Sequence, residues 1–159
     1  MRDSMCHLYF AYGLNLDRVE MGHRCPGAEY VGRARLAHHA FRINRRGVAT
    51  VLGSRGTEVH GALWLVADGH LRLLDQFEGV DFGLYVRQRR EIHFETSTPQ
   101  AHIYVATDMR GGSPRSDYLE TIIAAAEELG LPSVYIDELR KWLAPTRSVS
   151  VPTSRRREP

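Results

Sequence analysis

The segment Leu8-Tyr9-Phe10-Ala11-Tyr12-Gly13-Leu14-Asn15-Leu16 is an aromatic, apolar strand that runs directly into a Gly-Leu-Asn turn. Gly13 permits backbone conformations that other residues resist, and Asn15 can cap the helix-like segment that follows. Backbone N–H groups left free at a helix start attract an anion such as a carboxylate. The stretch therefore indicates a pocket for a small acid, although a first strand with a tight turn explains the same residues.

On the C-terminal side of this segment, alternating or apolar segments bounded by turn residues predict further strands. The expected strands are Cys6 to Tyr12, Tyr30 to Ile43, Ala49 to Leu52, Val59 to Val66, Leu84 to Phe94 and Ala101 to Thr107, with Gly53-Ser54-Arg55-Gly56 as a turn. In the segment 84–94 the apolar residues Leu84, Val86, Ile92 and Phe94 share one face. This spacing predicts hairpins in an antiparallel or mixed sheet.

Three segments have helical patterns. Asp68 is placed to cap a helix with Leu71, Leu74 and Phe77 near one face, and Gly79 ends it. Asp117 is placed to cap a longer helix, with Glu120 in the capping-box position and Gly130 as the stop. A last helix is expected from about Val134 to Leu143. The order of elements predicts an α+β fold, a small mixed β-barrel with flanking helices.

Length and composition describe one ordinary globular unit. The chain has 159 residues, 43% hydrophobic and 25% charged, and we expect a single domain over residues 1–143. Residues 144–159 are rich in Pro, Ser, Thr and Arg and are expected to form a flexible tail. There is no apolar run of membrane-spanning length and no signal-peptide pattern, so we expect no membrane association and a reduced, cytoplasmic setting.

Charged and metal-binding residue types point to no cofactor and no nucleic acid. Arginines cluster at residues 33–46 and 87–90, which favours solvated strand faces because no nucleic-acid motif accompanies them. The eight histidines lack ligand spacing, and Cys6 and Cys25 belong to no metal or disulfide pattern, so no metal is expected. The oligomeric state is open, with a homodimer as one alternative.

Glu78 is the acidic residue with a setting suited to proton transfer. It follows Phe77, precedes Gly79-Val80 and lies at a predicted helix end, where the partial negative charge of the helix disfavours ionisation. A carboxyl group with a raised pKa can take a proton in one step and return it in the next. The alternative is an exposed glutamate at the end of a helix.

Several motifs in order resemble the γ-glutamylcyclotransferase family. They are Tyr9-Phe10-Ala11-Tyr12-Gly13 with Asn15-Leu16, then Val59-His60-Gly61-Ala62-Leu63-Trp64, Leu74-Asp75-Gln76-Phe77-Glu78-Gly79-Val80, Gly83-Leu84-Tyr85-Val86, Ser113-Pro114-Arg115-Ser116-Asp117-Tyr118 and Gly130-Leu131-Pro132. The resemblance covers roughly Leu8 to Leu143. It implies a small β-barrel with flanking helices and an enzyme that cyclises a γ-glutamyl amide to 5-oxoproline, releasing an amine or amino acid.

The resemblance also implies the site residues. Glu78 falls on the catalytic acid/base, and no metal or other cofactor is required. The resemblance also implies the substrate-binding residues, together with tyrosines that would form the cavity wall: Tyr9, Phe10, Ala11, Tyr12, Gly13, Leu14, Asn15, Tyr85, Tyr104 and Tyr118. The backbone amides of the turn would receive the α-carboxylate of a small γ-glutamyl substrate. Tyr118 has an alternative role in packing at a helix start.

One position departs from the family pattern. Leu14 replaces the serine of the usual Tyr-Gly-Ser-Asn turn, which puts substrate choice in doubt more than the chemistry. Two alternatives to an ordinary γ-glutamylcyclotransferase stay open. One is removal of a γ-glutamyl protecting group from a biosynthetic intermediate by the same reaction, and the other is a non-catalytic small-molecule binding module of this fold.

Overall fold

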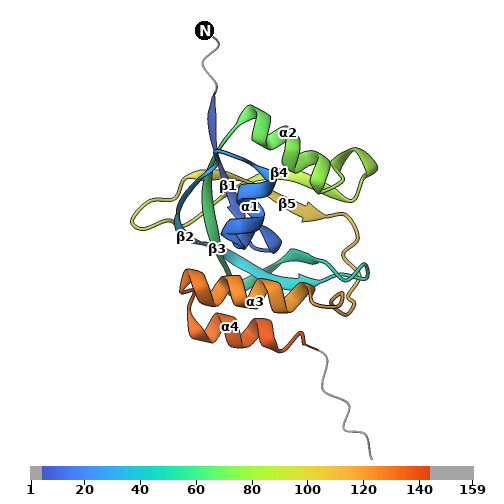
Figure 1. Ribbon diagram of the computed structural model, residues 1–159. Helices are drawn as coiled ribbons and strands as arrows, with labels where there is room; N and C mark the ends of the chain where they lie inside the picture. Colours follow the sequence, from blue (N-terminus) through green and yellow to red (C-terminus); the bar gives the residue numbers. More distant parts are fainter. Residues whose placement is uncertain (1–4, 144–159) are drawn as a thin grey trace, which may run out of the picture.

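The computed structural model describes residues 5–143 and contains a mixed sheet with helices on its flanks (Figure 1). The strands are β1 (Cys6–Ala11), β2 (Glu29–Ile43), β3 (Ala49–Ala67), β4 (Tyr85–Glu91) and β5 (Gln100–Ala106). The helices are α1 (Arg18–Arg24), α2 (Asp68–Phe77), α3 (Tyr118–Leu129) and α4 (Ser133–Arg140), with short 3-10 turns η1 (Leu14–Leu16) and η2 (Val80–Phe82). The expected tail, residues 144–159, lies outside the described residues.

The sheet places β1 at its centre, in the order β2-β3-β1-β5-β4. β1 pairs antiparallel with β3 and parallel with β5, which confirms a mixed sheet. The predicted barrel is corrected in one detail, because the sheet does not close. β2 meets the segment just after β4 at one isolated bridge, where the backbones of Arg35 and His93 exchange hydrogen bonds of 3.0 and 2.9 Å.

The two strands expected at 49–52 and 59–66 are one long strand, β3, and the turn expected at 53–56 was wrong as a strand boundary. β2 continues as the partner on both sides, with His39 opposite Gly53 and Ala37 opposite Glu58. Residues 54–57 therefore bulge opposite His38 alone, and His38 and Gly56 both have positive φ. The turn-forming composition is used for a bulge inside the strand rather than for a chain reversal.

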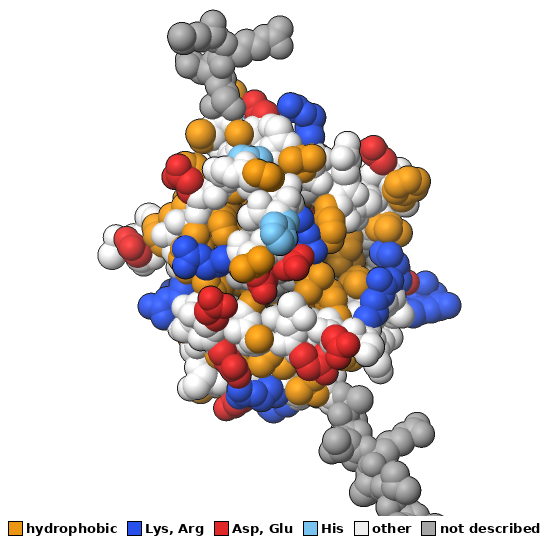
Figure 2. Space-filling model, in the orientation of Figure 1, with side chains coloured by type: hydrophobic (Ala, Val, Ile, Leu, Met, Phe, Trp, Pro, Cys, Tyr) orange, Lys and Arg blue, Asp and Glu red, His pale blue; other side chains and the backbone are white. Residues whose placement is uncertain are grey.

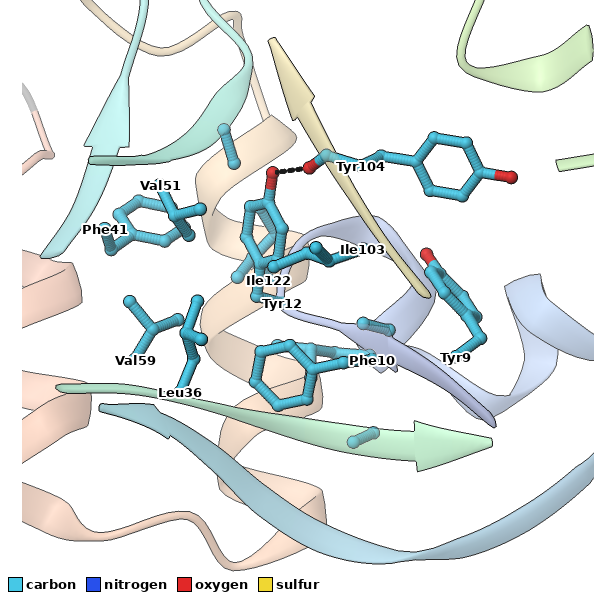
Figure 3. Packing of buried hydrophobic residues seen from close by; sticks show 14 of the residues in the cluster. Tyr9, Phe10, Tyr12, Leu36, Phe41, Val51, Val59, Ile103, Tyr104 and Ile122 are labelled. Carbon is cyan, nitrogen blue, oxygen red and sulfur yellow. Dashed lines mark hydrogen bonds between the residues drawn. The ribbon is translucent and has the colours of Figure 1, made fainter. Parts of the chain in front are cut away.

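Side chains alternate across β1 and connect the core to the site (Figure 3). Phe10 is fully buried and points toward Leu36 and Val59 in the hydrophobic core, whereas Tyr9 points the other way, toward Tyr104. On β4 the face predicted to be apolar is not the buried one throughout. There the phenol Tyr85 is buried and the apolar Val86 is 45% exposed.

The helices form where they were expected, but their starts differ. α2 begins at Asp68 with Ala67 in the cap position, and the Ala67 N–H donates to His70 Nδ1 (3.1 Å). Asp117 precedes α3 in the left-handed conformation (φ 61°), and its side chain makes no capping hydrogen bond. The expected capping box at α3 was therefore wrong. The left-handed residues Gly79 and Gly130 follow α2 and α3, as predicted.

α3 and α4 run side by side along one end of the sheet (Figure 1). Their buried residues include Leu119, Ile122, Ile136 and Leu139. α1, which follows the turn after β1 where a helix-like segment was expected, lies in front of the sheet in the same view. Within residues 5–143, no helix has both the length and the apolar content that a membrane span requires.

Candidate active site

A cavity of about 220 Å³ lies where the turn after β1 meets α1, the end of α2 and the start of α3. Its wall is mostly aromatic and apolar, with one carboxyl group and three guanidinium groups. The lining residues are Tyr9, Tyr12, Gly13, Leu14, Asn15, Arg24, Arg46, Val48, Ala49, Phe77, Glu78, Leu84, Tyr85, Tyr104, Arg115 and Tyr118. The volume suits a small molecule of a few hundred daltons or less.

Most of the residues proposed from the sequence meet at this cavity. Glu78, the four tyrosines Tyr9, Tyr85, Tyr104 and Tyr118, and the stretch 12–15 all line it. Phe10 and Ala11 instead lie in the hydrophobic core, at 0% and 1% exposure, and are not among the lining residues. Strand alternation accounts for Phe10, which points to the face opposite Tyr9.

The turn after β1 presents backbone donors to the cavity. Within residues 5–143 the amides of Gly13, Leu14 and Asn15 donate no hydrogen bond, while the carbonyls of Gly13 and Leu14 accept from Leu16 and Asp17. Gly13 lies close to α3, because a Cβ added there would be 3.6 Å from the Tyr118 hydroxyl. Three unpaired donors beside a cavity are an arrangement suited to a carboxylate.

Asn15 does not cap a helix, which corrects the expectation for this residue. The cap of α1 is Asp17, whose carboxylate accepts from the amides of Val19 (2.8 Å) and Glu20 (3.1 Å). Asn15 is 3% exposed, donates to the Tyr9 hydroxyl at 3.0 Å and accepts from Arg24. It holds a buried polar network next to the cavity instead.

The tyrosines are fixed by hydrogen bonds to the backbone and to α2. The Tyr12 hydroxyl donates to the Tyr104 carbonyl at 2.5 Å (Figure 3), and the Tyr85 hydroxyl donates to the Ala49 carbonyl at 2.7 Å. The Ala49 amide donates to the Tyr118 hydroxyl at 2.9 Å. Burial raises the pKa of each of these three phenols, to about 12 for Tyr118, so they stay protonated near neutral pH.

Glu78 is positioned by the end of α2. Its N–H donates to the Leu74 carbonyl at 2.8 Å, and the left-handed Gly79 turns the chain directly after it. Gly79 is required here, because a Cβ on it would lie 2.8 Å from Leu84. Burial raises the pKa of the Glu78 carboxyl to about 7, against the opposing charge of Arg24. The side chain is partly buried at the cavity, which excludes the alternative of an exposed helix-end glutamate.

Arg24 is a site residue that the sequence reasoning missed. Its guanidinium stacks on the Phe77 ring, 3.5 Å from the ring centroid, and contacts Asn15 and Glu20. Phe77, which was expected on the buried face of α2, is 50% exposed, and Arg24 covers one face of its ring. The sequence contained no clear signal for Arg24, because this residue belongs to none of the quoted motifs or arginine clusters.

Arg46 and Arg115 were also missed as cavity residues. Both line the cavity, Arg46 from the turn between β2 and β3 and Arg115 from the segment before α3. The sequence offered a signal for each, since Arg46 belongs to an arginine cluster and Arg115 lies within a quoted motif. Neither signal by itself indicates that the two segments meet.

No group of three or more His, Cys, Asp or Glu side chains within residues 5–143 is arranged to hold a metal ion. Glu78 is the cavity's carboxyl group, and the other polar side chains that line it are tyrosines, arginines and Asn15. The chemistry that these described groups can perform is proton transfer at Glu78 together with binding of anions.

Comparisons with known proteins find relatives along most of the chain. Residues 58–139 match the AIG2-like family. Human γ-glutamylcyclotransferase is 31% identical over 153 residues, covering 87% of this chain and 79% of the human protein, and the mouse protein is 32% identical, covering 84% and 77%. A solved γ-glutamyl cyclotransferase structure superposes with a TM-score of 0.81 at 30% identity, covering 92% of this chain and 93% of the other.

Proposed function

Because the chain belongs to the AIG2-like family together with the γ-glutamylcyclotransferases, we propose that it converts a γ-glutamyl amide to 5-oxoproline and releases the amine. The observation that carries the proposal is a partly buried carboxyl group with a pKa near 7, Glu78, in the same small cavity as the unpaired amides of the turn after β1. The cavity thus combines a proton carrier with a carboxylate-binding turn.

The reaction uses a nucleophile that the substrate already contains. Folding the γ-glutamyl group inside the cavity brings its α-nitrogen against the γ-carbonyl carbon, and a five-membered lactam closes as the bond to the departing nitrogen breaks. Near neutral pH the α-nitrogen is mostly an ammonium ion, which cannot attack. Glu78 removes a proton from it and then delivers that proton to the departing nitrogen.

The protons balance over the whole reaction. The α-ammonium loses two protons when it becomes the lactam N–H, and the amide nitrogen gains two when it leaves as an ammonium ion. No water and no redox partner are consumed. We also propose, as expected from the sequence, a small γ-glutamyl substrate, no cofactor and a cytoplasmic setting.

Substrate orientation is assigned to the turn and the tyrosines. The free amides of Gly13, Leu14 and Asn15 hold the α-carboxylate of the γ-glutamyl group. Phenols kept protonated by burial, such as Tyr118, confine the γ-glutamyl chain between aromatic walls. Leu14 lines the cavity with an apolar side chain, so only the backbone of this position contributes polar contacts.

The test is to incubate the purified protein with a panel of γ-glutamyl amino acids and γ-glutamyl amines and to measure 5-oxoproline. We expect at least one member to be converted, with one amine released for each 5-oxoproline formed. Release of free glutamate in place of 5-oxoproline would contradict ring closure. Binding of the panel without any turnover would favour the non-catalytic binding module.

A further inference from the structure

The turn between β2 and β3 is held tightly in place. Asn44 is 1% exposed, and its side-chain oxygen accepts from the amides of Arg46 (3.0 Å) and Val48 (3.3 Å). Its side-chain nitrogen donates to the Asp108 carbonyl at 3.0 Å. Gly47 has φ 80°, which completes the turn. The backbone of Arg46 is therefore held in a defined position.

The segment before α3 packs directly on this turn. The Arg115 amide donates to the Gly47 carbonyl at 3.1 Å, and Arg115 Nε donates to the Arg46 carbonyl at 2.9 Å. A Cβ on Gly47 would lie 2.8 Å from Arg115 Cγ, so the fit leaves no room for a larger residue. Two arginines far apart in sequence are thereby brought to one wall of the cavity.

The charges in the cavity do not balance. Arg24 pairs with Glu20 at 3.5 Å, but Arg46 and Arg115 form no ion pair within residues 5–143. Basic side chains also gather at the right-hand edge of the face shown in Figure 2, next to an apolar area. Two guanidinium groups without carboxylate partners, beside a pocket, form a site for an anion.

Arg46 and Arg115 come from the turn between β2 and β3 and from the segment before α3, so they add two charges to the amides of the turn that holds the γ-glutamyl carboxylate. The charge of Arg46 acts on Tyr85, where it opposes the rise in pKa that burial causes, and the charge of Arg115 acts in the same way on Tyr118. The hydroxyls of both tyrosines are hydrogen-bonded to the backbone of Ala49. The two charges therefore border the part of the cavity near Val48 and Ala49.

We propose that Arg46 and Arg115 form a subsite for anionic groups on the departing amine, so that the favoured substrates are γ-glutamyl derivatives of amines with more than one carboxylate. This inference rests on the proposed function, because it names the substrate class of the same site. The γ-glutamyl end occupies the turn after β1, and the departing part extends past Glu78 to the arginines.

The test uses three nearly isosteric substrates, γ-glutamylglutamate, γ-glutamylglutamine and γ-glutamylglutaminamide, whose departing amines carry two, one and no carboxylates. kcat/KM is measured from 5-oxoproline release in the wild type, in Arg46→Gln and in Arg115→Gln. In Arg115→Gln, the new side chain keeps the Cγ that packs on Gly47. Arg45→Gln is the matched control, because Arg45 is exposed in the same turn and does not line the cavity.

We expect kcat/KM in the wild type to fall roughly tenfold with each carboxylate removed, as for a charge-assisted hydrogen bond. Arg46→Gln and Arg115→Gln should each remove about one such tenfold step and should affect the neutral substrate least. Arg45→Gln should preserve the wild-type ranking. Equal rates on all three substrates in the wild type would overturn the subsite. An equal loss on all three in the arginine variants would overturn it too, because it would place the arginines on the γ-glutamyl part.

A binding measurement separates this inference from the proposed function. In Glu78→Gln, which blocks proton transfer, calorimetry measures the Kd of intact γ-glutamylglutamate and γ-glutamylglutamine. Tighter binding of the glutamate derivative, abolished by adding Arg46→Gln or Arg115→Gln, supports the subsite even if the wild type makes no 5-oxoproline. Equal binding of the two overturns it, even if 5-oxoproline is made.

Discussion

Two carboxyl groups at the end of α2 differ in their surroundings, although only one helical turn separates them. Asp75 does not line the cavity; its carboxylate accepts a hydrogen bond from the Tyr104 hydroxyl at 2.7 Å and lies 3.4 Å from Arg87 Nε. Glu78 lies at the cavity, with no hydrogen bond or ion pair to its side chain within residues 5–143.

The difference places, at the same helix end, a hydrogen-bonded carboxyl group and one that has no partner among the described residues. Partners that donate to a carboxylate stabilise its charged form, whereas burial without such partners favours the protonated form. Burial accordingly raises the pKa of Glu78 to about 7, where a carboxyl group exchanges protons readily near neutral pH. We therefore expect substitutions of Glu78 to change activity and its pH dependence, and substitutions at Asp75 to change mainly stability.

The largest effect is expected from Glu78→Gln, which keeps the shape of the side chain and removes its titrating proton site. The rate of 5-oxoproline formation should fall about 10²- to 10⁴-fold, the usual contribution of a general acid/base. Asp75→Asn is the matched control and should stay within a few-fold of the wild type, because Asp75 does not line the cavity. Equal rates for Glu78→Gln and the wild type would remove Glu78 from the mechanism.

The next effect concerns stability. The pKa of Glu78 is about 7 in the folded protein and about 4.5 in an unfolded chain, so the folded state holds the extra proton between these values. The free energy of unfolding should therefore fall as the pH rises from 4 to 7, by about 3 kcal/mol in total from this group.

Urea unfolding of the wild type and Glu78→Gln at pH 4 and pH 8 measures this contribution. Relative to the wild type, Glu78→Gln should gain stability between pH 4 and pH 8. Asp75→Asn should instead lose stability at pH 8, because its ion pair with Arg87 is removed. A constant stability difference between the wild type and Glu78→Gln across this pH range would contradict a raised pKa.

A smaller effect is expected from Arg24→Gln. The charge of Arg24 opposes the rise in the pKa of Glu78, so its removal should move the lower pH midpoint of kcat/KM upward, by up to about one unit. Arg18→Gln, an exposed position in the same helix that stacks on Tyr30, should leave this midpoint unchanged. A downward shift in Arg24→Gln would show that the arginine does not act on Glu78 electrostatically.

The smallest effect is expected from Tyr104→Phe, which removes one of the donors to Asp75. Thermal or urea unfolding should show a loss of about 1 kcal/mol, the typical net value of one hydrogen bond. The pH midpoint of activity should stay in place, because Tyr104 bonds to Asp75 and not to Glu78. A shifted midpoint would mean that the two carboxyl groups are coupled, and the contrast between them would have to be revised.

Much of the architecture was predictable from local patterns. Apolar alternation located β1, β2 and β5, and the glycines at 79 and 130 marked the helix ends. Local patterns failed where a long-range partner decides the outcome. β3 continues through a turn-like sequence because β2 pairs with it on both sides, and Asp117 does not cap α3 because its backbone is left-handed.

For the site, the motifs led to Glu78, Tyr9, the stretch 12–15, Tyr85 and Tyr118, all of which line the cavity, whereas Phe10 and Ala11 of the first motif lie in the core. The arginines depended on tertiary structure. Arg24, Arg46 and Arg115 come from three separate segments, and only packing brings their charges to one cavity. Burial by distant segments and the charge of Arg24 determine the pKa of Glu78. The sequence therefore identified Glu78 as the candidate acid, whereas its pKa depends on the fold.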